Sequence, residues 1–282
     1  MKRFLGTAFG NYSIDRNRPD LAGTSRLSPH LHFGEISPRQ IWHAVRQYAE
    51  KNGVTTWRTS QFLAEVGWRE FSYHLLFHYP DLATKNFDAR FDRFEWNAPD
   101  ERMLAAWRMG RTGYPVVDAG MRELWTTGYM HNRVRMVVAS FLVKHLLTDW
   151  RVGEDWFWDT LCDADAANNA ASWQWVAGCG ADAAPYFRVF NPVLQGEKFD
   201  SAGAYVRRWA PELARLPDRY VHRPWEAPTP PRDYPAPIVD HASAREETLA
   251  RYGILKSGKK TFVDLASTNP LYFLKCCSNS DF

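Results

Sequence analysis

The sequence predicts an all-α protein on the basis of three observations. Apolar residues recur at three- and four-residue spacing in several long segments, which is the period of an α-helix. No segment alternates apolar and polar residues as a strand does, and no strand–helix–strand unit is present. Residues that start and stop helices flank the periodic segments. With 282 residues, 45% of them hydrophobic, the chain can bury a sizeable core.

The first long helix is expected to run from Ser37 to Gly53. Ser37-Pro38-Arg39-Gln40 is a capping box with proline at the first helical position. Apolar side chains then follow at helical spacing until Gly53, a residue that commonly ends helices. A second helix is expected over residues 59–78, because an apolar stripe continues until just before Pro80.

Further helices are expected along the rest of the chain, at 116–127, 130–147, 154–161, 166–177 and 202–209. Six prolines fall within residues 224–237, so this stretch should be extended and run over the surface. After Gly253 the composition changes. We therefore expect a residual linker at 1–10, one helical domain at 11–253, and an atypical tail at 254–282.

The bulk composition restricts the compartment. No apolar run approaches the roughly 20 residues that a membrane span needs, and the basic start lacks the apolar stretch of a secretory signal. The four cysteines show neither metal-ligand spacing nor a disulfide framework, which favours a reducing compartment. We therefore expect a cytoplasmic protein without a membrane anchor.

The positive charge is carried mainly by arginine. Net charge is only +3, but arginine outnumbers lysine 26 to 9. Guanidinium groups bind phosphate and carboxylate in a bidentate manner, whereas lysine acts as a point charge. A GC-rich genome would give the same bias, so composition permits a phosphate-bearing partner without requiring one.

Three hydroxyls and a guanidinium stand close together in Thr24-Ser25-Arg26-Leu27-Ser28, just ahead of helical sequence. Hydroxyls, backbone N–H groups and a helix start suit a diphosphate. The alternative is an ordinary helix start with surplus serines, and this motif alone favours that alternative.

Two later helices carry polar groups beside aromatic ones. Glu65, Trp68 and Arg69 share a helix face and could grip a planar base, although this motif alone favours an ordinary amphipathic helix with one arginine at its edge. Asn132 and Met136 also share a face.

The segment 163–175 opens with acidic and amide side chains and ends in Trp173-Gln174-Trp175. Aspartates near a helix start are expected from the helix dipole alone. Trp173 and Trp175 should face nearly opposite sides, one toward the protein interior and one toward a cavity. No metal site is expected, because His30 and His32 lack a third ligand nearby.

Seven motifs stand in order along the chain: Tyr12, Thr24-Ser25-Arg26-Leu27-Ser28, Trp68-Arg69-Glu70-Phe71, Thr112-Gly113-Tyr114-Pro115, Met130-His131-Asn132-Arg133, the segment 163–175 and the segment 190–200. Together they closely resemble the photolyase and cryptochrome family, over residues 11–250. The resemblance implies an all-helical FAD-binding domain. It is nearest to the class I cyclobutane pyrimidine dimer photolyases, without the antenna domain that normally precedes the helical domain.

The resemblance implies a set of cofactor-binding residues: Tyr12, Thr24, Ser25, Arg26, Leu27, Ser28, Phe62, Arg135, Asp163, Ala164, Asp165 and Asn169. The early members would hold the FAD diphosphate, and Asp163 to Asp165 would contact the sugar and flavin. Arg135, paired with Asp163, would lie near the isoalloxazine, and Asn169 would sit opposite flavin N5. Phe62 stands where some relatives carry an indole.

The resemblance also implies residues for substrate and electrons. The lesion cavity would be lined by Glu65, Trp68, Asn132, Met136 and Trp175. DNA around the lesion would be touched by Arg16, Arg69, Arg133 and Gln195. Trp173, Trp150 and Trp96 would form an electron-hopping chain from the flavin to the surface.

The implied activity is light-dependent repair of cyclobutane pyrimidine dimers in UV-damaged DNA. The dimer would be flipped into the cavity and receive an electron from excited, reduced, anionic FAD, while Glu65 stabilises the dimer radical anion. No antenna chromophore site is expected. We expect a monomer in the bacterial-type cytoplasm, with access to the nucleoid.

Two other hypotheses stand beside repair. A non-enzymatic blue-light receptor of the cryptochrome type would use the same FAD and the same tryptophans, whether or not DNA binds. A fragment that no longer folds stably is the third hypothesis, because a face once covered by the antenna domain would be exposed. The cavity carboxylate Glu65 favours repair among the three.

Overall fold

The structure, a computed structural model, describes residues 1–183 and 187–257. Within these ranges the chain forms helices and turns and no strand, as predicted from the sequence. The α-helices are α1 (Lys2–Thr7), α2 (Tyr12–Asp15), α3 (Ser28–His32), α4 (Pro38–Asn52), α5 (Gln61–His78), α6 (Glu101–Arg108), α7 (Pro115–Thr127), α8 (Asn132–Lys144), α9 (Trp150–Thr160), α10 (Ala166–Ala177), α11 (Pro192–Phe199), α12 (Ala204–Trp209) and α13 (His241–Ser257). Short 3₁₀ helices are η1 (Trp57–Thr59), η2 (Ala89–Arg93), η3 (Pro211–Leu213), η4 (Asp218–Tyr220) and η5 (Pro224–Glu226).

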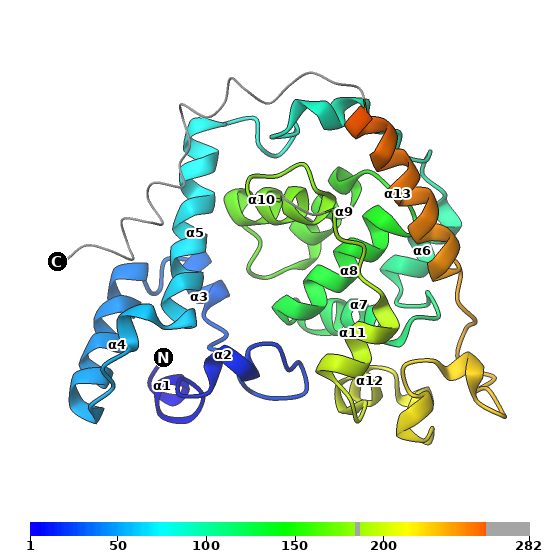
Figure 1. Cartoon of the computed structure of the whole chain (residues 1–282). Helices are drawn as coiled ribbons and strands as arrows, with labels where there is room; N and C mark the ends of the chain where they lie inside the picture. The colour runs from blue at the N-terminus through cyan, green and yellow to red at the C-terminus, as the bar shows by residue number, and fades with distance from the viewer. Residues whose placement is uncertain (184–186, 258–282) are drawn as a thin grey trace.

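The helices build two apolar cores. A smaller N-terminal core joins α1, α2, α4 and α5 around Phe4, Ile41 and Phe62. A larger core joins α6 to α10 with α12 and α13, around Trp107 and Phe141. Figure 1 shows the first group at the left of the molecule and the second at the right, with α5 running along the boundary. The packing of α5 on α10 connects the two.

Residues 1–10 differ from the expected linker. They form α1 and a turn, and Phe4, Leu5, Ala8 and Phe9 are buried in the N-terminal core. Phe4 packs against Phe62 with ring centroids 4.6 Å apart. Apolar side chains of a short segment gain a core only from such distant contacts, which local sequence does not reveal.

The capping signals in the sequence are confirmed. The Ser37 hydroxyl accepts from Gln40 N at 3.2 Å, and the Gln40 side chain accepts from Ser37 N at 2.8 Å. Gly53 and Gly128 end α4 and α7 with φ of 67° and 66°, a left-handed conformation that costs glycine little.

Helix α9 starts four residues earlier than expected, at Trp150, because the Asp149 carboxylate caps it by accepting from Arg151 N at 2.9 Å. Among the described helices, α1, α2, α6, α11 and α13 were not anticipated. Most of them are short, so periodicity had few turns to show. Asp100 and Asn191 cap α6 and α11 and were the available signals.

The proline-rich segment is not confined to the surface. Beyond η5 it is irregular, as missing N–H groups dictate. However, Tyr234 is buried and donates its hydroxyl hydrogen to Asp118 at 2.5 Å. Ile238 N donates to Thr112 O at 3.0 Å. These bonds fasten the segment to the start of α7.

The last described helix passes the expected domain boundary. α13 continues through Gly253 to Ser257, and Leu255 is buried against the larger core. The remainder of the expected tail, 258–282, lies outside the described residues, and so do Cys276 and Cys277. Among the described helices, none has the length and apolar character needed to cross a membrane.

Candidate functional site

The site is built where α5 meets α10. Arg69 of α5 donates from Nη1 to Asp165 Oδ2 at 2.9 Å, across 96 residues of sequence. The same guanidinium donates to the Tyr73 hydroxyl at 3.1 Å. Asp165 also caps α10, since Oδ1 accepts from Asn168 N at 2.7 Å. One buried carboxylate thus fixes both the start of α10 and its distance from α5.

A second ion pair lies beside the first. Arg135 of α8 donates from Nη1 and Nη2 to the two oxygens of Asp163, at 3.0 and 2.8 Å, which confirms the expected pairing of these residues. Burial acts to raise the pKa of Asp163, but the Arg135 charge and hydrogen bonds from Arg135 and Ser28 outweigh it, so the pKa is lowered. Asp163 is therefore a fixed negative charge.

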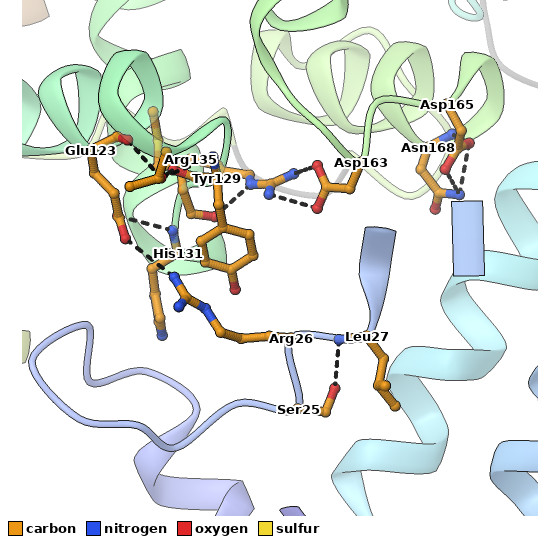
Figure 2. A network of polar contacts seen from close by, with 12 residues as sticks. Ser25, Arg26, Leu27, Glu123, Tyr129, His131, Arg135, Asp163, Asp165 and Asn168 are labelled. Atoms are coloured by element: carbon orange, nitrogen blue, oxygen red, sulfur yellow. Dashed lines mark hydrogen bonds and ion pairs between the residues drawn. The ribbon is translucent and has the colours of Figure 1, made fainter. Parts of the chain in front are cut away.

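The hydroxyl-rich segment 24–28 faces this pair from the N-terminal side, as Figure 2 shows. Ser25 Oγ accepts from Leu27 N at 3.4 Å, which folds the segment into a tight turn. Arg26 has φ of 53°, a left-handed conformation that is strained for a residue with a Cβ. The Ser28 hydroxyl reaches Asp163. Segment 24–28 and Asp163 therefore belong to one polar site.

Two residues of this network were missed from the sequence. The Arg26 guanidinium lies 4.3 Å from the Tyr129 ring centroid and 3.8 Å from Glu123 Oε1. Glu123 is buried and accepts from Tyr205 Oη at 2.6 Å. One sequence signal could have identified Tyr129, because it directly precedes the Met130–Arg133 motif.

On the N-terminal wall, Tyr12 and Phe62 lie in the smaller core with ring centroids 5.4 Å apart. The Tyr12 hydroxyl donates to Glu65, and Arg16 forms an ion pair with the same carboxylate. Burial, together with the charge of Glu65, raises the pKa of Tyr12, so the phenol remains a donor. The structure therefore brings together a residue predicted for FAD, one predicted for DNA and the carboxylate predicted for the lesion cavity.

Helix α8 supplies the next group. Asn132 opens the helix and is exposed, and Met136 lies one turn later, half-buried. Arg133 donates to Asn17 Oδ1 at 2.5 Å and lies over the Phe199 ring. His131 caps the helix, because Nδ1 accepts from Arg133 N at 3.2 Å. Burial and four neighbouring arginines lower the pKa of His131 to about 4.

Helix α10 presents two faces, as predicted. Trp173 is buried in the larger core, 4.9 Å from Phe157 between ring centroids. Trp175 is half-buried and lines a cavity of about 150 Å³ with Lys144 and Arg188, and the lining of this cavity includes none of the other residues predicted for the lesion cavity. Burial lowers the pKa of Lys144 to about 7.

Asn169 on α10 is oriented by α9. Its Nδ2 donates to Glu154 O at 3.0 Å and to Glu154 Oε1 at 2.8 Å. The amide hydrogens are therefore used within the protein. The carbonyl Oδ1 is the group that Asn169 can offer to a ligand.

The three tryptophans of the expected electron chain differ in burial. Trp173 packs on Gly153, one turn along α9 from Trp150. Trp150 is fully buried and donates to Asn86 Oδ1 at 2.8 Å. Trp96 is half-buried, and its neighbour Asn97 is bonded to Leu147 O just before α9.

The remaining predicted residues are more scattered. Trp68 exposes 39% of its surface on α5 and contacts Phe71. Thr24 is half-buried, Leu27 is buried, and Ala164 packs against the larger core between the two aspartates. Gln195 is on α11 and keeps an unbonded buried Oε1. Gln195 lies on α11, whereas Arg69 and Arg133, which were also predicted to contact DNA, lie on α5 and α8.

The donor set suits FAD. Hydroxyls and backbone N–H groups of 24–28 match a diphosphate, carboxylates match ribityl and ribose hydroxyls, and the Arg135 charge matches an anionic flavin ring. Within residues 1–183 and 187–257 there is no group of three potential metal ligands. The hydroxyl, backbone N–H, carboxylate and guanidinium groups named above suit an organic, phosphate-bearing cofactor.

Comparison with known proteins also indicates an FAD-binding domain. Residues 62–253 match the family described as the FAD binding domain of DNA photolyase. The chain is 55% identical over 262 residues to the deoxyribodipyrimidine photo-lyase of Agrobacterium fabrum strain C58, covering 90% of this chain and 54% of that protein. It is 43% identical over 285 residues to Cryptochrome-1 of Arabidopsis thaliana, covering 95% and 42%.

Among solved structures, a bacterial class III photolyase from Agrobacterium tumefaciens superposes with a TM-score of 0.84 at 54% identity, covering 91% of this chain and 54% of that one. That protein is described as class III, whereas the sequence motifs here predicted class I. The chain spans about half the length of the curated relatives it matches. With a family match over 62–253 and a helical fold shared with this photolyase structure, the chain belongs to the FAD-binding domain family of the DNA photolyases.

Proposed function

We propose that this chain repairs cyclobutane pyrimidine dimers in UV-damaged DNA in a light-dependent reaction. The observation that carries the proposal is Glu65, a carboxylate one helical turn from Arg69 of the cofactor wall and held in place by Tyr12 and Arg16. Relatives at 45 to 55% identity that are named deoxyribodipyrimidine photo-lyase support the same activity.

The proposed lesion cavity takes a dimer that has been flipped out of the duplex. Flipping costs less for a poorly stacked lesion than for a normal base pair. Trp68 and Trp175 keep accessible ring surface for stacking, and Asn132 is exposed at the start of α8. Met136 would contact the dimer from the next turn of α8.

Residues around this cavity are proposed to contact the DNA backbone, namely Arg16, Arg69, Arg133 and Gln195. Arg69 and Arg133 already bond to Asp165 and Asn17, respectively. Each guanidinium has five N–H groups, so donors remain for phosphate. We propose chromosomal DNA as the partner, which would place the protein in the cytoplasm with access to the nucleoid. We also propose that the protein acts as a monomer.

The protein's own groups have defined tasks in this reaction. When bound, reduced anionic FAD supplies an electron to the dimer on absorbing blue light and receives it back once the cyclobutane bonds have opened. Glu65, held in place by Tyr12 and Arg16, hydrogen-bonds the dimer and so contributes to stabilising its charged form. Asn169 would offer its Oδ1 to the flavin ring, since its amide hydrogens are used by Glu154, and the Asp163–Arg135 pair would hold the ring.

The test is the loss of dimers from UV-irradiated DNA mixed with FAD-loaded protein and a reductant. We expect dimers to disappear under blue light and to persist in the dark. Glu65→Ala should lower the number of dimers split per absorbed photon, whereas Glu50→Ala, at an exposed carboxylate of α4, should not. Unchanged dimer content under light with the FAD-loaded protein would refute the proposal.

A blue-light receptor is the second candidate, and the tryptophans favour it. Trp173 and Trp150 are buried and Trp96 is half-buried, a sequence suited to reducing oxidised FAD without DNA. The similarity to Cryptochrome-1 supports this reading. A light-dependent change in protease susceptibility that Trp150→Phe abolishes is expected for a receptor. Identical cleavage patterns in light and dark would count against it.

A further inference from the structure

Tyr129 lies where two parts of the cofactor site meet. Both the Arg26 and Arg135 guanidinium groups lie over its ring, at 4.3 and 5.4 Å from the centroid. Arg26 belongs to the turn 24–28 and Arg135 to the pair with Asp163. Figure 2 shows Tyr129 between these elements. One aromatic ring therefore contacts both the turn proposed for the diphosphate and the arginine proposed for the flavin ring.

The turn 24–28 has to be stabilised by contacts with residues outside it. Arg26 has φ of 53°, and such a conformation persists in a residue with a Cβ only when surrounding contacts enforce it. Its side chain is 56% exposed, so burial does not fix it. Its guanidinium instead lies against the Tyr129 ring and close to the Glu123 carboxylate.

Glu123, which lies beside Arg26, is itself held in place by hydrogen bonds. Its side chain is buried, and Oε2 accepts from Tyr205 Oη at 2.6 Å and from His131 N at 3.4 Å. Glu123 Oε1 lies 3.8 Å from Arg26 Nη2. The carboxylate is thus held by α12 and by the turn before α8, while its second oxygen faces the cofactor turn.

We propose that Tyr129, with Glu123 behind it, is a positioning residue for FAD: the ring holds Arg26 and thereby sets the turn 24–28 for the diphosphate. The inference rests on FAD binding and on the proposed role of 24–28, and not on DNA repair. The phenol oxygen has no part in it, because the ring face makes the contact.

The experiment measures the dissociation constant and release rate of FAD by recovery of flavin fluorescence, together with the visible circular dichroism of bound flavin. Tyr129→Leu should weaken FAD binding about tenfold, and Tyr129→Phe should restore it. Tyr220→Leu is the matched control, since it removes a ring under Arg219 at 4.5 Å, outside the site. It should leave FAD affinity unchanged.

A double-mutant cycle separates positioning from a general packing effect. Arg26→Gln should weaken FAD binding, and adding Tyr129→Leu to it should cost little more, because both changes break one contact. Fully additive losses would overturn the proposal, as would Tyr129→Phe binding FAD as weakly as Tyr129→Leu. If Tyr129→Leu does not fold, unchanged FAD affinity of Arg26→Gln or of Glu123→Gln overturns it instead. Normal FAD binding without dimer repair would refute the repair activity and leave this inference standing.

Discussion

His131 has to remain neutral for α8 to keep its cap. Its Nδ1 accepts from Arg133 N, so a proton on that nitrogen would remove the hydrogen bond at the helix start. Burial and nearby arginines already lower the pKa of His131 to about 4. The unfolded chain, with a pKa near 6.5, therefore binds this proton first as the pH falls.

The stability of the protein should consequently decline between pH 6.5 and pH 4. Because the unfolded state binds more protons in that window, moving from pH 7 to pH 5 should cost about 2 kcal/mol of unfolding free energy through this group. His131→Asn keeps a capping side chain but does not titrate, so it should flatten the decline. Urea unfolding at both pH values measures the difference. An equally steep decline in the variant would show that other groups cause it.

Gly153 controls the approach of two tryptophans. A Cβ at this position would overlap the six-membered ring of Trp173. We expect Gly153→Ala to cost about 1–3 kcal/mol of stability through this overlap and to slow photoreduction of bound flavin, because Trp173 moves relative to α9.

Gly67→Ala is the control for Gly153→Ala. It places a methyl group on exposed α5 with no atom within 4 Å, so it should stabilise the helix by about 0.5–1 kcal/mol and leave photoreduction unchanged. Thermal melting and the rate of flavin bleaching under blue light give both quantities. Equal photoreduction rates in the two variants would show that packing at Gly153 does not affect electron transfer to the flavin.

At the scale of elements, Gln174 fastens α10 to the segment that follows α5. Its buried Nε2 donates to Leu82 O at 2.6 Å and Lys85 O at 2.9 Å, and its Oε1 accepts from Phe87 N at 2.7 Å. Each of these three backbone groups loses its partner if the amide is replaced by an apolar chain.

Gln174→Met should therefore destabilise the protein by about 3 kcal/mol or more, since buried backbone groups are left without hydrogen bonds. Gln47→Met, on the exposed face of α4, is the matched control and should change stability by less than about 0.5 kcal/mol. Denaturant unfolding of both variants measures the cost. A Gln174→Met protein as stable as the control would show that water replaces the amide.

The sequence predicted the long helices and left others unseen for physical reasons. The Ser37 box and Gly53 are local signals, so α4 was found with nearly correct ends. The burial of Phe4 depends on Phe62, 58 positions away, and no local pattern encodes it. The Arg135–Asp163 pair was predicted through the family resemblance. Tyr129 was not, because its role arises from where Arg26 points.

At the scale of the whole molecule, two cores are joined by α5, α10 and the polar site between them. FAD bound at residues from both sides would tie the cores together. Since a ligand that binds only the folded state stabilises it, FAD at a hundredfold excess over its dissociation constant should add about 2.7 kcal/mol.

We therefore expect one cooperative melting transition that moves upward with added FAD. Riboflavin, which lacks the diphosphate and adenosine, should raise the melting temperature less. Scanning calorimetry at several FAD concentrations makes the measurement. A broad transition that FAD does not shift would instead favour the hypothesis of a fragment that does not fold stably.

The bond between Arg69 and Asp165 also has a consequence in time. The two residues are 96 positions apart, so at about 5–20 residues per second the ribosome delivers Asp165 on the order of 5 to 20 s after Arg69. During that interval the side chains of the N-terminal core can pack together, whereas Arg69 still lacks its partner Asp165. Capture of the cofactor therefore has to wait until α10 has emerged.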